Sequence, residues 1–237
     1  MSVDWYSRTE LLIGKNNLQK LKNAKVVVLG LGGVGGSCAE ALCRSGIGNL
    51  MIIDNDDIDI TNINRQIIAT HENIGECKIN VMQKRLKSIN NKINMEAYKI
   101  FCLPENSDFI FNYQPDYIVD AIDTITTKIF FAKKTHDLNI NFISCMGMGN
   151  RLDNTLIRCG KLSDTIGCSC AVAKIIRKKL KEFGILDLNV VYSLEKPSKV
   201  IVLNSNSNGR HVPGSFACVP PVAGYFLASK VVNDIIY

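Results

Sequence analysis

The chain has 237 residues, of which 46% are hydrophobic and 21% charged, and its 28 basic and 22 acidic residues give a formal net charge of +6. This length is enough for one full hydrophobic core, no apolar run approaches the roughly eighteen residues of a membrane span, and residues 1–10 lack the pattern of a secretion signal. We therefore expect a cytoplasmic protein with a single domain over residues 1–237, whose modest positive charge permits an anionic partner without requiring one.

The first half of the sequence predicts helices and strands in alternation. A capping box at 7–10 starts a helix that runs to about residue 21, and the apolar run at 25–29 is typical of a strand buried on both faces of a parallel sheet. This alternation indicates an α/β fold with a doubly wound, mostly parallel sheet in a nucleotide-binding core over residues 1–149. The remaining predicted elements of this core are helices at 34–45, 78–90 and 124–138 and strands at 49–53, 94–100, 117–120 and 141–146.

After Gly149 the alternation of strands and helices ends, so residues 150–237 are predicted to form a substrate-side extension. A short strand at 157–159 precedes a basic helix at 169–183, which Gly184 closes. Strands at 190–193 and 200–203 have no helix between them, so we expect a small antiparallel addition to the sheet. Residues 205–214 are rich in Asn, Ser and Gly, which is typical of a mobile loop. An apolar helix is predicted at 220–237.

The nine cysteines are scattered and odd in number, which does not fit a disulfide framework. No Cys-x-x-Cys pair exists, so a structural zinc site is not expected. Cys168 and Cys170 form the only close pair, and we interpret them as small residues at a helix start. Cys218, before the last helix, is predicted to be buried packing.

A glycine-rich loop joins the first strand to the second helix. Gly30, Gly32, Gly33 and Gly35 lie in this loop, and glycine lets a backbone approach phosphate while a helix N-terminus offers free N–H groups. Asp54 ends the second strand about twenty residues on, where an acid binds ribose hydroxyls. These residues alone leave NAD(H), ATP and a purely structural turn as open alternatives.

The residues that follow the ribose acid favour ATP. Asp56, Asn62, Arg65 and Gln66 come within twelve residues of it, and an NAD site rarely needs an arginine and an amide this soon. The guanidinium fork can bind the phosphates of ATP in a bidentate manner. Lys78 stands at a predicted helix start, where its charge opposes the helix dipole, and this arrangement makes sense if the lysine faces a polyphosphate. A solvated lysine is the alternative.

Two carboxylates end the buried strand at 117–120. Asp120 and Asp123 lie at a carboxyl edge, where α/β sheets bind ligands. Asp123 is the candidate for holding Mg²⁺ beside the phosphates. Alternatively, Asp123 caps the helix that starts near Thr124, and the two roles are compatible.

These motifs resemble the ThiF/MoeB/HesA-like adenylating superfamily, which includes ubiquitin-activating enzymes and the enzymes that adenylate bacterial sulfur-carrier proteins. The glycine loop, Asp-x-Asp, Asn-x-x-Arg-Gln, a lysine thirteen residues on and Asp-Ala-Ile-Asp occur in that order within residues 5–147. The resemblance implies a homodimer in which Arg8 reaches the partner's site as an arginine finger. It also implies that ATP or Mg²⁺ is bound by Asp54, Asn62, Arg65, Gln66, Lys78 and Asp123.

Within this superfamily the chain is most similar to the tRNA threonylcarbamoyladenosine dehydratases. It is short, lacks the paired Cys-x-x-Cys motif, and carries segments at 146–155, 213–215 and 219–224 that resemble this branch. The resemblance implies ATP-dependent cyclisation of threonylcarbamoyladenosine in tRNA through an acyl-adenylate, followed by intramolecular attack of a urea nitrogen. Arg65, Lys78 and Arg8 would neutralise the charge that grows on the phosphates.

The resemblance leaves further partners and functions open. A monovalent alkali cation near the site and a sulfur-relay protein are compatible with it, and the basic helix segment 174–181 is either a contact for tRNA phosphates or a solvated face. The alternative function is an adenylyltransferase that activates the C-terminus of a ubiquitin-like sulfur-carrier protein, in which Cys168 or Cys170 could accept the acyl group. A non-catalytic nucleotide-binding module and an NAD-dependent oxidoreductase are less favoured, since the phosphate-directed residues are all present and no residue suits hydride transfer.

Overall fold

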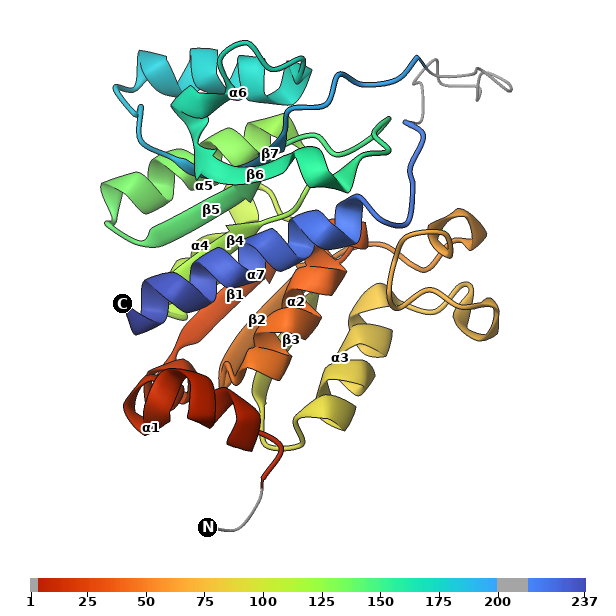
Figure 1. The fold of residues 1–237 in the computed structure, drawn as a ribbon, viewed down its shortest axis with the longest axis vertical. Helices are drawn as coiled ribbons and strands as arrows, with labels where there is room; N and C mark the ends of the chain where they lie inside the picture. The colour runs from red at the N-terminus through yellow and green to blue at the C-terminus, as the bar shows by residue number, and fades with distance from the viewer. Residues whose placement is uncertain (1–3, 200–212) are drawn as a thin grey trace.

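The structure is a computed structural model that describes residues 4–199 and 213–237 (Figure 1). Seven strands form one sheet in the order β3-β2-β1-β4-β5-β7-β6. Every neighbouring pair is parallel except β6 and β7, which are antiparallel. The predicted α/β fold with a mostly parallel sheet and a small antiparallel extension is therefore confirmed.

The helices and strands lie where the sequence predicts them, to within two residues at each end. Among the α-helices and strands of the described residues, only the short helix α4 was not expected. The strands are β1 (Lys25–Leu29), β2 (Asn49–Asp54), β3 (Asn94–Lys99), β4 (Tyr117–Asp120), β5 (Asn141–Cys145), β6 (Ile157–Lys161) and β7 (Asn189–Ser193). The helices are α1 (Ser7–Asn23), α2 (Gly33–Ser45), α3 (Lys78–Ile89), α4 (Asp108–Asn112), α5 (Ile125–Asp137), α6 (Ala171–Glu182) and α7 (Pro220–Ile236).

Helices cover both faces of the sheet. Successive side chains of a strand point to opposite faces, so Val26 and Val28 pack in one core with residues of α2, α3 and α7. Val27 and Leu29 pack in a second core with residues of α4, α5 and α6. This arrangement explains why the β1 sequence is continuously apolar.

The C-terminal helix α7 packs closely on α2, as Figure 1 shows. A Cβ atom at Gly224 would lie 2.3 Å from the Val34 carbonyl oxygen, so only glycine allows this approach. The first residue of α7, Pro220, lies against Gly33 at the start of α2. The end of the chain therefore supports the helix that follows the glycine loop.

Two local predictions need correction or fall outside the described residues. Ser7 is the first residue inside α1, after Tyr6, and no side chain caps this helix; the Ser7 hydroxyl instead accepts a hydrogen bond from the Asp4 N–H at 2.9 Å. The capping box was therefore wrong. The strand at 200–203 and most of the loop at 205–214 lie outside the described residues, and the antiparallel partner of β7 is β6. Among the helices described, none is long and apolar enough to cross a membrane.

Candidate active site

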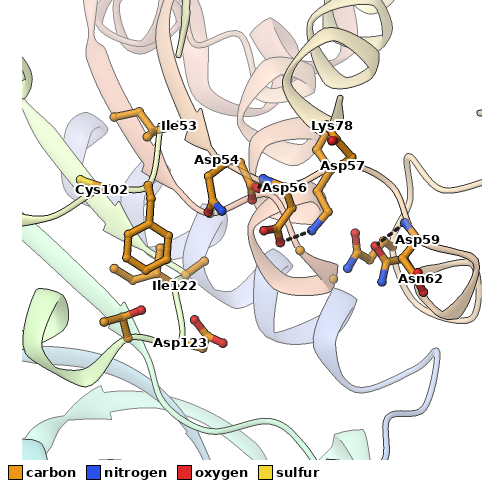
Figure 2. A pocket seen from close by; sticks show the side chains of 18 of the residues that line it. Ile53, Asp54, Asp56, Asp57, Asp59, Asn62, Lys78, Cys102, Ile122 and Asp123 are labelled. Carbon is orange, nitrogen blue, oxygen red and sulfur yellow. Dashed lines mark hydrogen bonds and ion pairs between the residues drawn. The ribbon is translucent and has the colours of Figure 1, made fainter. Parts of the chain in front are cut away.

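A cavity of about 600 Å³ opens at the carboxyl ends of β1, β2 and β4, and we call it the nucleotide cavity. Ligands of open α/β sheets bind at this edge, where the loops after neighbouring strands converge. Figure 2 shows Asp54, Asp56 and Lys78 together on one side of the cavity, and Ile53, Cys102 and Ile122 on the other, with Asp123 next to Ile122. The cavity collects residues that are far apart in the sequence.

The glycine loop forms one wall. Gly30 adopts a φ of +86°, and its N–H donates to the Ile53 carbonyl at 2.8 Å. A Cβ atom at Gly35 would lie 1.8 Å from the Gly30 oxygen, so Gly35 is needed for the turn and does not line the cavity. Gly32 has no neighbouring heavy atom closer than 4.0 Å to such a Cβ. Gly32 therefore leaves open space at the N-terminus of α2, which suits an approaching phosphate, whereas a Cβ atom at Gly33 would lie 3.0 Å from the Arg65 carbonyl oxygen and from Pro220.

Asp54 connects this loop to the end of β2. Its carboxylate accepts the Leu31 N–H at 2.6 Å and the Asp56 N–H at 2.8 Å. Burial raises the pKa of Asp54 above its ordinary value, while the positive charge of Lys78 opposes this shift. The carboxylate is thus held at the cavity wall as an acceptor, as ribose hydroxyls require.

Lys78 is the first residue of α3 and is only 4% exposed, so the alternative of a solvated lysine is wrong. Its Nζ donates to Asp56 Oδ2 at 2.7 Å, the contact drawn as a dashed line in Figure 2. The Asp56 side chain is 55% exposed and therefore remains hydrated. The fold thus places the buried ammonium group of Lys78 at the cavity, and the half-exposed carboxylate of Asp56 compensates its charge.

Asn62 and Gln66 are buried in the segment between β2 and α3, and both line the cavity. The Asn62 Oδ1 accepts the Asp59 N–H at 3.2 Å, while the Gln66 Oε1 is buried without a hydrogen-bond partner in the part of the chain described. A buried acceptor without a partner is costly. It therefore fits a ligand that donates a hydrogen bond from the cavity.

Arg65 also lines the cavity and is half-buried. Its guanidinium donates to the Thr61 carbonyl oxygen at 2.6 Å and to the Asn64 Oδ1 at 2.9 Å. Both contacts use the NH1 atom, and both acceptors belong to the same segment as Arg65. The arginine is thus braced locally at the wall of the cavity.

Of the two carboxylates after β4, only Asp123 lines the cavity. Asp120 is fully buried and bonds Lys128 at 2.9 Å. The N-cap of α5 is Thr124, and no side chain caps this helix, so the capping alternative for Asp123 is wrong. Within the described residues no three His, Cys, Asp or Glu residues gather as a metal cluster. Asp123 therefore fits Mg²⁺ only together with phosphate oxygens, which is how proteins commonly hold this ion.

The opposite wall of the cavity is apolar, and the sequence analysis missed it. Ile53, Ile100, Phe101, Cys102 and Ile122 line this side. Burial raises the pKa of the Cys102 thiol to about 12, so the thiol is neutral. This wall fits the flat face of a purine. The available signal was that these residues end or directly follow the parallel strands β2, β3 and β4.

Other predicted residues lie away from this cavity. Arg8 is exposed near the start of α1 and does not line the cavity of its own chain. Cys170 is the N-cap of α6 and is buried, and Cys168 is half-buried, in agreement with small residues at a helix start. Cys218 is exposed, so its predicted burial was wrong: α7 begins only at Pro220, and Cys218 stands in the turn before it.

Known proteins are similar to this chain in sequence and in fold. The chain is 39% identical to a tRNA threonylcarbamoyladenosine dehydratase of Bacillus subtilis (strain 168), over 98% of this chain and 94% of the relative. It is 35% identical to the Escherichia coli (strain K12) protein of the same name, over 78% of this chain and 70% of the relative. A sulfur carrier protein adenylyltransferase of Thermus thermophilus is 35% identical, but over only 53% of this chain.

The structural comparison agrees with the sequence comparison. The crystal structure of E. coli tRNA N6-threonylcarbamoyladenosine dehydratase, TcdA, in complex with ATP matches with a TM-score of 0.87 and 30% identity. The match covers 98% of this chain and 93% of that chain. The sequence model of the protein family described as "ThiF family" matches residues 6–192, which include every residue that we assign to the nucleotide cavity. The chain therefore belongs to the ThiF family.

Proposed function

We propose that this protein is an ATP-dependent tRNA threonylcarbamoyladenosine dehydratase. The observation that carries the proposal is the nucleotide cavity, in which a ribose acid, a glycine-lined helix start and two cations surround one space. The relatives of that name align over nearly the whole chain, and a neighbour of that name binds ATP. These facts support ATP as the co-substrate and tRNA as the substrate.

In the proposed reaction the carboxylate of the threonylcarbamoyl group attacks the α-phosphate of ATP, and pyrophosphate leaves. A urea nitrogen of the same group then attacks the activated carbonyl, a five-membered ring closes and AMP leaves, so the net change is loss of one water. Because ring closure is intramolecular, no protein nucleophile is needed.

The polar residues predicted from the sequence have the following roles in this proposal. Asp54 accepts the ribose hydroxyls, while Gly32 and Gly33 receive phosphate oxygens at the start of α2. Arg65 and Lys78 neutralise the charge that develops during adenylation. Asp123 would hold Mg²⁺, which supplies further neutralisation of phosphate charge when bound. Asn62, Gln66 and Asp56 complete the polar wall.

The proposal includes a homodimer in which Arg8 acts on the partner's site. Two neighbours of Arg8 on α1, Leu11 and Leu12, are 88% and 85% exposed, and adjacent exposed leucines favour an interface. Mixing Arg8→Ala with Lys78→Met protein tests this arrangement. Mixed dimers would keep one intact site, so we expect about a quarter of wild-type activity from two inactive proteins. Activity no higher than the sum of the separate variants would refute a role of Arg8 in the partner's site.

The basic face of α6 is the proposed contact for tRNA phosphates. Ala173, Ile176 and Leu180 bury the opposite face, which leaves Lys174 and Lys178 exposed. Arg177, which the sequence analysis grouped with these lysines, donates to the Thr165 hydroxyl at 2.7 Å and is partly committed to the fold. Removing Lys174 and Lys178 should lower the salt dependence of tRNA binding. An unchanged slope would identify α6 as a solvated face.

Nucleoside mass spectrometry tests the whole proposal. Threonylcarbamoylated tRNA is incubated with the protein, ATP and Mg²⁺, with and without potassium, and its nucleosides are analysed. We expect ATP-dependent conversion of the modified adenosine to a species lighter by one water. No conversion, together with pyrophosphate exchange that requires a carrier protein ending in Gly-Gly, would favour the sulfur-carrier adenylyltransferase instead. A sulfur-relay partner and the cytoplasmic location stay predictions.

A further inference from the structure

A second cavity of about 460 Å³ adjoins the nucleotide cavity, and the function proposed above does not yet use it. The two cavities share Ala121, Ile122 and Asp123, the loop that leaves β4. This loop is therefore a wall with one face toward each cavity. A group held in the second cavity lies on the other side of a three-residue wall from a bound nucleotide.

The lining of the second cavity is apolar and rich in sulfur. Met146, Met148, Cys145 and Cys170 line it, and each is less than 10% exposed. Val172, in the first turn of α6, lines it as well. Thioether and thiol groups make favourable contacts with aromatic rings. The lining therefore fits a flat aromatic group better than a charged or extended one.

The charged residue Lys128 does not change this character, because its charge is already compensated. Its Nζ donates to Asp120 at 2.9 Å, to the Ser144 hydroxyl at 3.2 Å and to the Cys145 carbonyl at 2.8 Å. An ammonium group has three N–H donors, so all of them are used. Lys128 holds the ends of β4 and β5 together and offers no free donor to a ligand.

Arg151 supplies the cation of this cavity. It is 2% exposed, its Nε donates to the Gly147 carbonyl at 3.1 Å, and its NH1 donates to the Glu195 carbonyl. The Glu195 carboxylate in turn accepts the Leu152 N–H at 3.0 Å. The loop after β5 is thus fixed to the segment after β7, and Arg151 is oriented before any ligand arrives.

Asn150 fixes the rim of the second cavity from both sides. Its N–H donates to the Gly214 carbonyl at 2.8 Å, and its Oδ1 accepts the Gly214 N–H at 2.6 Å. Its own carbonyl accepts the Ser198 N–H at 2.7 Å. The lining residues Pro197 and Pro213 are adjacent to these contacts. The cavity therefore has a built rim, and its shape does not depend on a bound ligand.

We propose that the second cavity binds the modified purine base of the RNA substrate together with its threonyl side chain, an inference that rests on the proposed dehydratase function. Enzymes that act on a base take it out of its stack and hold it against apolar side chains. The carboxylate to be activated is only a few bonds from the base, so the base must lie next to the α-phosphate. The shared wall provides this placement, and Arg151 attracts the anionic substituent.

An extended Gly-Gly tail of a carrier protein is the competing occupant. Such a tail has no side chains to fill a wide apolar chamber, and recognition of an extended chain relies on backbone hydrogen bonds. The lining offers sulfur atoms and methyl groups. The observations therefore favour the base over the tail, and the peptide becomes one arm of the test.

The test measures binding of the free nucleoside threonylcarbamoyladenosine to the AMP-saturated protein by calorimetry. Val172→Phe fills the cavity, and Ile175→Phe is the matched control, because Ile175 is on the same helix, 43% exposed, and outside the lining. We expect the nucleoside Kd to rise at least about tenfold in Val172→Phe, the change that 1.4 kcal/mol produces. The AMP Kd should remain that of the wild type in both variants.

Three results would overturn the proposal: equal nucleoside binding by Val172→Phe and wild type, displacement of AMP by the nucleoside, or binding of a Gly-Gly peptide in place of the nucleoside. If Val172→Phe loses AMP binding, the same measurements on Gly147→Ala decide between these results. A Cβ atom at Gly147 would make ordinary contacts of 3.5 Å with Cys170 and 3.6 Å with Val172, so this variant adds a methyl group to the lining without a clash. Nucleoside binding without tRNA conversion would refute the dehydratase function alone. Conversion with unimpaired Val172→Phe binding would refute this site alone.

Discussion

Removing the charge of Lys78 separates the catalytic role that we propose for this residue from its role in the fold. Lys78→Met keeps the buried methylene stem and deletes only the ammonium group. The lost contact is the 2.7 Å bond to Asp56, whose side chain is 55% exposed. A carboxylate that is already hydrated regains water when its partner is removed, so the cost resembles that of a surface ion pair, about 0–1 kcal/mol.

The expected effects therefore differ in size. A loss of up to 1 kcal/mol lowers the Tm of a chain of this length by no more than about 4 °C. In contrast, deleting one group that stabilises transition-state charge commonly costs about 100- to 1,000-fold in turnover. Lys78→Met should therefore melt almost like the wild type and dehydrate threonylcarbamoylated tRNA at least about 100-fold more slowly.

The assay pairs a thermal melt with single-turnover nucleoside mass spectrometry. Lys99→Met is the matched control, because Lys99 makes a similar 2.6 Å ion pair with Asp57 but does not line the cavity. We expect Lys99→Met to keep near-wild-type activity. The reasoning fails if Lys78→Met retains more than a tenth of the activity, or if it unfolds well below the wild-type Tm.

Three further outcomes are expected from the same geometry. Asp123→Asn should raise the Mg²⁺ concentration needed for half-maximal turnover without changing the Tm, which a Mg²⁺ titration and a melt would check. Gly35→Ala should destabilise the fold by more than about 3 kcal/mol, because its Cβ would lie 1.8 Å from a backbone oxygen, whereas Gly32→Ala should fold and bind ATP more weakly. Lys128→Met leaves a buried carboxylate unpaired, which costs about 3–5 kcal/mol and lowers the Tm by roughly 6–20 °C.

The pH dependence of ATP affinity gives a further expected outcome, and the burial of Asp54 sets its direction. The pKa of Asp54 lies above its ordinary value because burial disfavours the charged form, and Lys78 opposes this shift. As pH falls from 7, Asp54 therefore takes up a proton earlier than an exposed aspartate, and ATP affinity decreases. In Lys78→Met the decrease should begin at a higher pH. Identical profiles in both proteins would show that the two groups are not coupled.

The polar half of the nucleotide cavity could be predicted from sequence because it is assembled from one local stretch. Gly32, Asp54, Arg65 and Lys78 lie within fifty residues of one another and follow two adjacent parallel strands. Each strand is marked by a continuous apolar run; Gly32, Asp54 and Lys78 stand at strand or helix ends, and Arg65 lies in the segment between β2 and α3. Local pattern and three-dimensional position therefore coincide in this stretch.

The apolar half could not be predicted in the same way. Ile100, Phe101 and Cys102 have no motif, and they reach the cavity only because β3 pairs with β2 and ends at the same edge. The predicted burial of Cys218 was wrong for a related reason. Its burial was inferred from the apolar helix that follows, whereas the fold places it in the turn before that helix begins.

The loop after β4 contributes Ala121, Ile122 and Asp123 to the lining of both cavities. Asp120 and Lys128 form a buried pair that joins the end of β4 to the end of β5 through Ser144 and Cys145. The loops that leave these two strand ends place Asp123 at the wall between the two cavities and Met146 in the lining of the second cavity. A buried pair is poor evidence for stability in itself. It can nevertheless fix the distance between two loops, and a reaction that joins a carboxylate to a phosphate depends on that distance.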